Sequence, residues 1–228
     1  MVQVFEAARN PRFGSPYPLL YSRDKTGTPQ EGGMVRFGWA ENGLYVFAEL
    51  EDSCIIAQNQ QDEQLHFEHG DVFELFVKPR DEPYYWEMYV TPRGNKSTLF
   101  FPRDREGLTL DDFLHGHAFR GLEAMAEETS VGWNALMYIP MEQLTALGAG
   151  WGDSTEWTIF CGRYNYNSED LADPELTMTP SLSKESHHLV DEYAILKMSE
   201  MNRTEPDWVD PAGSNELMGD EVVVQFAR

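Results

Sequence analysis

The sequence predicts an antiparallel β-sandwich of the immunoglobulin-like or jelly-roll type, with one short helix. Three observations support this fold class. Apolar and polar residues alternate with a period of two over many short segments, turn residues separate those segments, and helical patterns are scarce. Many short strands joined by turns are typical of two packed antiparallel layers. At 228 residues the chain can bury a substantial core as one domain.

The first predicted hairpin covers residues 34–39 and 44–51. Its first strand has apolar side chains at the odd positions, and Asn42-Gly43 supplies the turn. In the second strand, apolar residues again occupy every other position. This alternation predicts one face that packs on the core and one amphipathic face.

The second predicted hairpin covers residues 72–77 and 84–91, with a turn over 79–83 that contains two prolines. Its first strand carries Glu74 in the middle of an apolar run. Because side chains alternate between the two faces of a strand, the residues around Glu74 can be assigned to one face. Those predicted on that face are Val72, Phe76, Tyr85, Glu87 and Tyr89.

The remaining elements are predicted from shorter patterns. A short helix is expected over 141–147, because Pro140 precedes it and Gly148 follows it. Further strands are predicted at 97–101, 131–138, 156–164, 193–198 and 221–226.

The domain organisation predicted from these elements is a single domain over residues 1–228. Its core covers about 34–198, and 199–228 form a C-terminal extension. Within that extension, 199–220 are rich in Glu, Asp, Asn, Pro and Gly and are expected to be irregular.

The charge of the chain restricts its partners. It carries 17 basic and 39 acidic residues, a formal net charge of −22. A surface this negative repels phosphate backbones and anionic lipids, so we expect neither nucleic-acid nor membrane partners. No apolar run approaches the roughly 20 residues that a membrane-spanning helix needs. The charge is compatible with divalent cations or with neutral ligands such as sugars.

The compartment, the oligomeric state and the cysteine pairing stay open. The first residues lack the basic region and apolar core of a secretory signal, so we expect a cytoplasmic protein as written, or a mature form whose signal was removed. Cys54 and Cys161 have apolar neighbours, which favours two buried free thiols over a disulfide.

Glu74 is the main candidate for a functional residue. A buried carboxylate without a partner costs several kcal/mol, so Glu74 must either pair internally or face a ligand. Arg163 ends a predicted strand beside Tyr and Asn residues, where its guanidinium could bind a ligand or a carboxylate. We expect Glu74 and Arg163 to share one network.

An ordered set of segments points to a known family. The segments are Trp39…Gly43-Leu44-Tyr45-Val46, Glu51-Asp52, Asp71-Val72-Phe73-Glu74-Leu75-Phe76, Tyr85…Val90-Thr91-Pro92-Arg93-Gly94, Gly132-Trp133…Ile139-Pro140…Leu144, Trp157…Arg163 and Thr179-Pro180…His188…Tyr193-Ala194-Ile195-Leu196. In this order and spacing, the chain from about residue 34 to 198 resembles the family 9 carbohydrate-binding modules.

The resemblance implies a β-sandwich that binds glycans, often at chain ends, between aromatic rings and polar side chains. It implies that Glu74 contacts the sugar and that His188 borders the site. Tyr89 stands where the family has a basic side chain. The family has two aromatic platforms that stack on the sugar. In this chain Glu68, next to Phe67, stands at the position of the first platform, and the second falls near His187.

Metal binding is considered at two kinds of residue. Some members of the family hold structural calcium, and Asp52 and Asp71 are the candidates by position; no cofactor is expected to be required. The histidines occur as the pairs 66/69, 115/117 and 187/188, and we interpret them as loop or surface residues.

These observations predict a non-catalytic carbohydrate-binding domain, of the kind associated with polysaccharide catabolism. The ligand-binding residues predicted are Glu74, Tyr85, Glu87, Tyr89, Arg163 and His188. One alternative is a related haem-binding redox sandwich, with Met88 or His188 as an axial ligand. Another is an enzyme that acts on glycans, with this sandwich as its catalytic body. The sequence assigns no catalytic residue.

Overall fold

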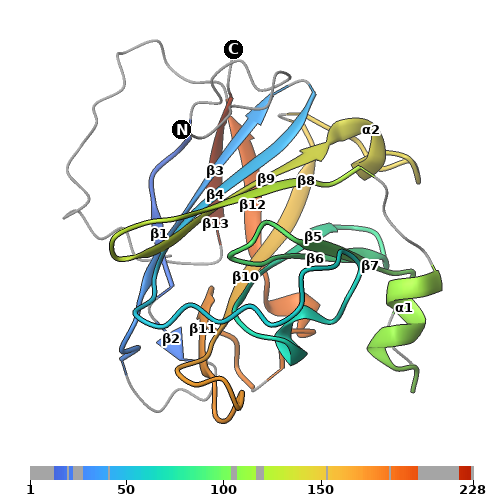
Figure 1. Cartoon of the computed structure of the whole chain (residues 1–228). Helices are drawn as coiled ribbons and strands as arrows, with labels where there is room; N and C mark the ends of the chain where they lie inside the picture. The colour runs from blue at the N-terminus through green and yellow to red at the C-terminus, as the bar shows by residue number, and fades with distance from the viewer. Residues whose placement is uncertain are drawn as a thin grey trace.

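The structure is a computed structural model, and it confirms the predicted all-β class (Figure 1). The strands are β1 (Tyr17–Pro18), β2 (Tyr21–Ser22), β3 (Gly33–Ala40), β4 (Gly43–Glu51), β5 (Val72–Pro79), β6 (Tyr85–Val90), β7 (Lys96–Phe101), β8 (Glu123–Glu128), β9 (Gly132–Pro140), β10 (Glu156–Asn165), β11 (Glu175–Thr179), β12 (Ala194–Ser199) and β13 (Glu221–Phe226).

The helical elements are short. They are the α-helices α1 (Leu110–Gly116) and α2 (Met141–Leu144) and the 3-10 helices η1 (His66–Glu68) and η2 (Val190–Glu192). None of the helices in the described part of the chain is long and apolar enough to cross a membrane. The structure describes residues 13–19, 21–22, 28–40, 42–103, 107–116, 121–152, 154–184, 186–199 and 221–226. His117 and most of the predicted extension lie outside these ranges.

The main strands form one hydrogen-bonded path in the order β7-β6-β5-β10-β12-β13-β3-β4-β9-β8, which folds into two layers (Figure 1). One layer contains β7, β6, β5 and β10, and the other contains β3, β4, β9 and β8. Most neighbours are antiparallel, whereas β12, β13 and β3 pair in parallel where the path passes from one layer to the other. The two predicted hairpins are confirmed as β3–β4 and β5–β6.

The main core fills the space between the two layers. In β5 it takes Phe73, Leu75 and Val77, so every second residue of this strand points inward. The opposite layer contributes residues of β3, β4 and β9 in the same alternating way. The alternation predicted from the sequence is therefore the alternation found.

A second hydrophobic cluster covers the outer face of the β5–β6–β10 layer, which is not open to solvent. Val72, Phe76, Tyr89 and Phe160 come from the strands themselves. Buried side chains of α1 and of the segment that joins β11 to β12 complete the cover. As a result, Glu74 lies beneath a layer of other residues, although it is on an outer face.

Four strands, β1, β2, β8 and β11, and the helix α1 were not predicted from the sequence. β8 has the sequence EAMAEE and is the edge strand of its layer, so charged side chains suit it and apolar alternation is weak. β11 is only five residues long and pairs with the second half of β10. The predicted helix 141–147 is confirmed only for its first turn, α2.

Substitution of Trp157 is the most direct test of the assigned core. Its indole is 1% exposed, lies 6.2 Å from the ring of Trp86, and donates to the carbonyl of Gly150 at 3.1 Å. We expect Trp157→Ala to lower the free energy of unfolding by about 3–5 kcal/mol, because it leaves a large cavity. Urea unfolding measures this loss. Leu147→Ala, at a side chain 55% exposed, should change the value by less than about 0.5 kcal/mol. Equal losses in the two variants would contradict the assignment of the core.

Candidate functional site

The predicted site residues separate onto two faces of one layer. β5 pairs with β10 so that Glu74 lies opposite Gly162 and Phe73 lies opposite Arg163. Arg163 therefore shares the inward face of Phe73, whereas Glu74 points outward with Val72 and Phe76. The prediction that Glu74 and Arg163 share one network is wrong, because their side chains lie on opposite faces of the sheet.

Glu74 has a histidine partner instead of an arginine. The side chain is 2% exposed, and its Oε2 lies 2.8 Å from Nδ1 of His187. His187 comes from the segment between β11 and β12, which folds back over the outer face. His187 lies in a loop, as predicted, but it is not at the surface, since it is 6% exposed.

Gly162 makes room for this pair. A Cβ at this position would lie 2.9 Å from Cε1 of His187 and 3.4 Å from Oε2 of Glu74. The first distance is too short for any real side chain unless the imidazole moves. The glycine on β10 is therefore required by the approach of His187 to Glu74, and not by an unusual backbone angle.

The neighbouring strand β6 adds a second carboxylate and two phenols to the same face. The hydroxyl of Tyr89 donates to Oε1 of Glu87 at 2.6 Å, and both side chains are buried. Burial and the adjacent carboxylates of Glu87 and Glu74 hold the pKa of Tyr89 well above its usual value. The phenol therefore stays protonated and remains a donor.

His188 completes this group and is its most exposed member. Its Nδ1 lies 2.9 Å from the hydroxyl of Tyr85, and its Nε2 lies 3.8 Å from Oε2 of Glu87. Its side chain is 18% exposed, compared with 3% for Glu87. We call the six residues of this group the outer cluster: Glu74, Tyr85, Glu87, Tyr89, His187 and His188.

Aromatic rings surround the outer cluster. The ring of His187 lies 5.0 Å from Phe160, 5.9 Å from Phe76 and 6.0 Å from Tyr164. Nearer η1, Phe67 stacks on Tyr164 at 5.3 Å. Hydrogen bonds strengthen in surroundings that exclude water, so this apolar frame favours recognition of a polar ligand by few groups.

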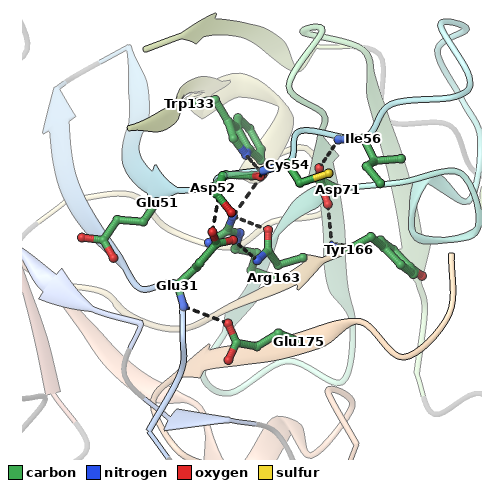
Figure 2. Close-up of polar contacts among 12 residues, drawn as sticks. Glu31, Glu51, Asp52, Cys54, Ile56, Asp71, Trp133, Arg163, Tyr166 and Glu175 are labelled. Atoms are coloured by element: carbon green, nitrogen blue, oxygen red, sulfur yellow. Dashed lines mark hydrogen bonds and ion pairs between the residues drawn. The ribbon is translucent and has the colours of Figure 1, made fainter. Parts of the chain in front are cut away.

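Arg163 belongs to a separate, inward network (Figure 2). It is fully buried, and its guanidinium donates to Oδ2 of Asp52 at 3.3 Å, to Oδ1 of Asn165 at 2.6 Å and to the carbonyl of Gly32 at 3.2 Å. Asn165 in turn donates to Glu31 at 2.7 Å. Arg163 is thus a structural counter-ion, and its predicted contact with a ligand finds no support in this geometry.

Two buried aspartates surround this network (Figure 2). Asp52 accepts from Nε1 of Trp133 at 3.2 Å and from the backbone of Cys54, and burial raises its pKa despite the charge of Arg163. Asp71 accepts from the backbone N–H groups of Ile56 and Tyr166. Burial raises the pKa of Asp71 to about 7, although these two bonds oppose the shift.

Calcium binding by Asp52 and Asp71 stays a prediction, and the present arrangement does not fit it. N–H donors already occupy the carboxylate oxygens, and Arg163 supplies the positive charge beside them. Over the described residues, no group of three or more His, Cys, Asp or Glu side chains is arranged to hold a metal ion. A cation here would have to break these bonds.

The structure also places the suggested haem ligands, the two cysteines and His66. Met88 is fully buried between the layers while His188 lies on the outer face, so the two suggested axial ligands lie on opposite sides of β6. Both cysteines are free thiols, as expected, but Cys54 is exposed and only Cys161 is buried. His66 is 1% exposed and is not a surface residue.

No protein-family model and no curated protein matches this sequence. Among solved structures, a protein from Bacteroides uniformis that is proposed to bind carbohydrate has a TM-score of 0.59 at 13% identity, over 85% of this chain and 88% of that one. A family 9 carbohydrate-binding module from Caldicellulosiruptor kristjanssonii in complex with glucose has a TM-score of 0.56 at 13% identity, over 90% and 92%. At this identity the likeness shows a shared fold, one that carbohydrate-binding proteins also have.

Removing Arg163 should destabilise the protein strongly. We expect Arg163→Met to lower the free energy of unfolding by about 3–5 kcal/mol, because Asp52 is left buried without its counter-ion. Urea unfolding provides the value. The matched control is Arg80→Met, which breaks an exposed pair with Glu156 and should cost less than about 1 kcal/mol. A similar small loss in both variants would show that Arg163 is not the centre of this network.

Asp71 should contribute a decrease in the free energy of unfolding as the pH rises from about 4 to about 7. Over this range the folded state keeps the proton on Asp71, whose pKa is about 7, whereas the unfolded chain, with a pKa near 3.8, loses it. Each unit of pKa difference is worth about 1.4 kcal/mol. Asp71→Asn should flatten this dependence in denaturation experiments at several pH values. Identical slopes in the variant and the parent would contradict the assignment to Asp71.

Proposed function

We propose that this protein binds carbohydrate without cleaving it, and that the ligand is held by the outer cluster. The observation that carries the proposal is the pairing of two carboxylates, Glu74 and Glu87, with phenols and imidazoles on one ring-lined face. Glu74 lies directly opposite Tyr89 in the β5–β6 ladder, and Glu87 lies opposite Phe76, so the two carboxylates are diagonal neighbours.

This set of groups suits the chemistry of a sugar. Sugar hydroxyls donate strong hydrogen bonds to carboxylates, and phenols and imidazoles can both donate and accept. The C–H face of a sugar ring packs well on aromatic side chains, which Phe67 and Tyr164 supply at the partly exposed edge of the cluster. The similar folds of known carbohydrate-binding proteins support this proposal.

The charge of the outer cluster favours neutral sugars. Two of its six members are carboxylates and none is a lysine or arginine. The chain as a whole carries a net charge of −22, which also repels anions. We therefore expect neutral glycans to bind in preference to uronic acids or sulfated sugars.

The burial of the cluster favours the end of a glycan chain as the ligand. His188, with 18% of its side chain exposed, is the group that a ligand can reach first. Glu74 and His187 become accessible only if the segment that carries both histidines shifts. A terminal sugar would need only one opening beside His188, whereas an internal sugar would need openings on two sides.

The two carboxylates also favour a second candidate, a glycan-hydrolysing enzyme. Glycosidases use a pair of carboxyl groups roughly 5–10 Å apart. Glu74 and Glu87 are diagonal neighbours on β5 and β6, and this proximity supports the second candidate. Release of reducing sugar from an oligosaccharide panel, lost in Glu74→Gln, would replace the binding proposal by this one.

The proposal is tested by a glycan array followed by calorimetry on the glycans that bind. Glu74→Gln keeps the shape of the side chain and a bond to His187, so the fold should survive. The affinity should fall roughly 10- to 100-fold, because a charged acceptor is lost. Glu49→Gln, which removes the same charge from an exposed position on the other layer, should bind like the parent. Unchanged affinity in Glu74→Gln would contradict the proposal.

Gly162→Ala offers an independent variant without a change of charge. Its Cβ displaces the imidazole of His187 from Glu74 and should weaken glycan binding at least several-fold. Another Gly→Ala variant such as Gly94→Ala would not be a matched control. Gly94 has a φ of 79°, which disfavours any residue with a Cβ, whereas the backbone of Gly162 has no positive φ. Ala135→Gly, in the core of the other layer, controls for a general loss of stability. Equal binding by Gly162→Ala and the parent would argue against a role of His187.

A further inference from the structure

His66 is a buried histidine whose ring nitrogens are poorly satisfied by the protein. It is 1% exposed, and within the described residues neither ring nitrogen has a hydrogen bond of normal geometry, although the backbone of Lys96 lies close enough to raise the pKa of His66 against the effect of burial. Burial lowers the pKa of His66, so the imidazole is neutral near pH 7. A neutral imidazole presents one N–H donor and one acceptor nitrogen.

The ring of His66 lies against the outer cluster. Its centroid is 6.2 Å from that of Tyr89, with the two rings nearly perpendicular. The next residue, Phe67, also contacts Tyr89 edge-on, at 6.3 Å. Since Tyr89 is bonded to Glu87 and lies opposite Glu74, His66 adjoins the two carboxylates through a single ring.

Hydrogen bonds of adjacent residues and of the backbone hold His66 in position, and the imidazole itself contributes none of them. The backbone of Gln64 donates to Oγ of Ser97 at 2.8 Å, and Ser97 donates back to the carbonyl of Gln64 at 2.8 Å. The hydroxyl of Tyr166 donates to the carbonyl of Phe67. The N–H of His69 closes η1 on the carbonyl of His66. The imidazole is therefore held in place, and the protein uses little of its bonding capacity.

This arrangement is unfavourable for stability alone. Each buried polar group without a partner costs about 1–3 kcal/mol, whereas a phenylalanine of similar shape would carry no such cost. A buried polar group of this kind calls for an explanation, and a ligand that bonds it is one such explanation. From its sequence context, His66 was expected to be a loop or surface residue without a role.

We propose that His66 is a further ligand-contacting residue of the carbohydrate site. Its donor and acceptor nitrogens bond hydroxyl groups of the sugar, which can both accept and donate. η1 thereby forms a second wall of the site, across Tyr89 from the segment that carries His187 and His188. The inference rests on the proposed function.

The test compares stability and affinity in the variant His66→Phe. If His66 contacts the ligand, this variant loses at least roughly 10-fold in affinity for the best neutral glycan of the array, while its thermal midpoint stays equal to that of the parent or rises. His69→Phe, the same substitution three residues away in the same segment, should leave the affinity unchanged. Calorimetry and thermal unfolding give both readouts on the full chain.

The outcomes separate the inference from the proposed function. If the parent binds no glycan, both are wrong. If the parent binds and His66→Phe binds equally well, only the role of His66 is wrong. If His66→Phe fails to fold, the ring-nitrogen resonances of His66 in the ¹⁵N-labelled parent decide instead: they should shift on addition of the glycan, and unchanged resonances at saturation would overturn the inference.

Discussion

The register between β5 and β10 is the constraint on which both polar networks depend. It places Glu74 opposite Gly162 and Phe73 opposite Arg163, so that adjacent residues of each strand serve opposite faces. A one-residue slip of β5 would send Glu74 into the apolar core, and a one-residue slip of β10 would send Arg163 to the outer cluster. Either slip would separate a buried group from its partner, His187 for Glu74 or Asp52 for Arg163, and the cost of an unpaired buried charge opposes it.

The inward network of Arg163 and the outer cluster differ in whether they contain a permanent cation. The inward one combines Arg163 with carboxylates and an amide, and it joins residues of β10 to Gly32, Asp52 and Trp133 from distant parts of the chain (Figure 2). The outer cluster contains carboxylates, phenols and imidazoles but no permanent cation, and His188 reaches the surface. In the first network the protein itself supplies the cation that the carboxylate of Asp52 needs. The second has the composition of a site that a neutral polar ligand would complete.

Much of the fold follows from local patterns. The hairpins β3–β4 and β5–β6 were predictable because one strand face packs on the core and period-two alternation records this burial directly. β8 was missed because an exposed edge strand has little apolar alternation to detect. The inward direction of Arg163 was available in the sequence, since Trp157, Ile159 and Cys161 at the preceding odd positions all face the core.

The burial of two histidines could not be predicted from local sequence patterns. The burial of His66 and His187 arises when two connecting segments fold over the outer face, and this depends on contacts between residues far apart in the chain. His187 lies in a polar run without periodicity, so only the family resemblance pointed to its position. Gly162 likewise has no local signal, because its small size matters only once His187 has been placed above it.

The central claim is that the outer face of the β5–β6–β10 layer binds a glycan. The most direct measurement is a crystal structure with the tightest-binding neutral glycan. We expect a terminal sugar whose hydroxyls lie about 2.5–3.0 Å from the carboxylate of Glu74 or Glu87. A sugar found instead on the outer face of β4 and β9, with the Glu74–His187 bond intact at 2.8 Å, would contradict it.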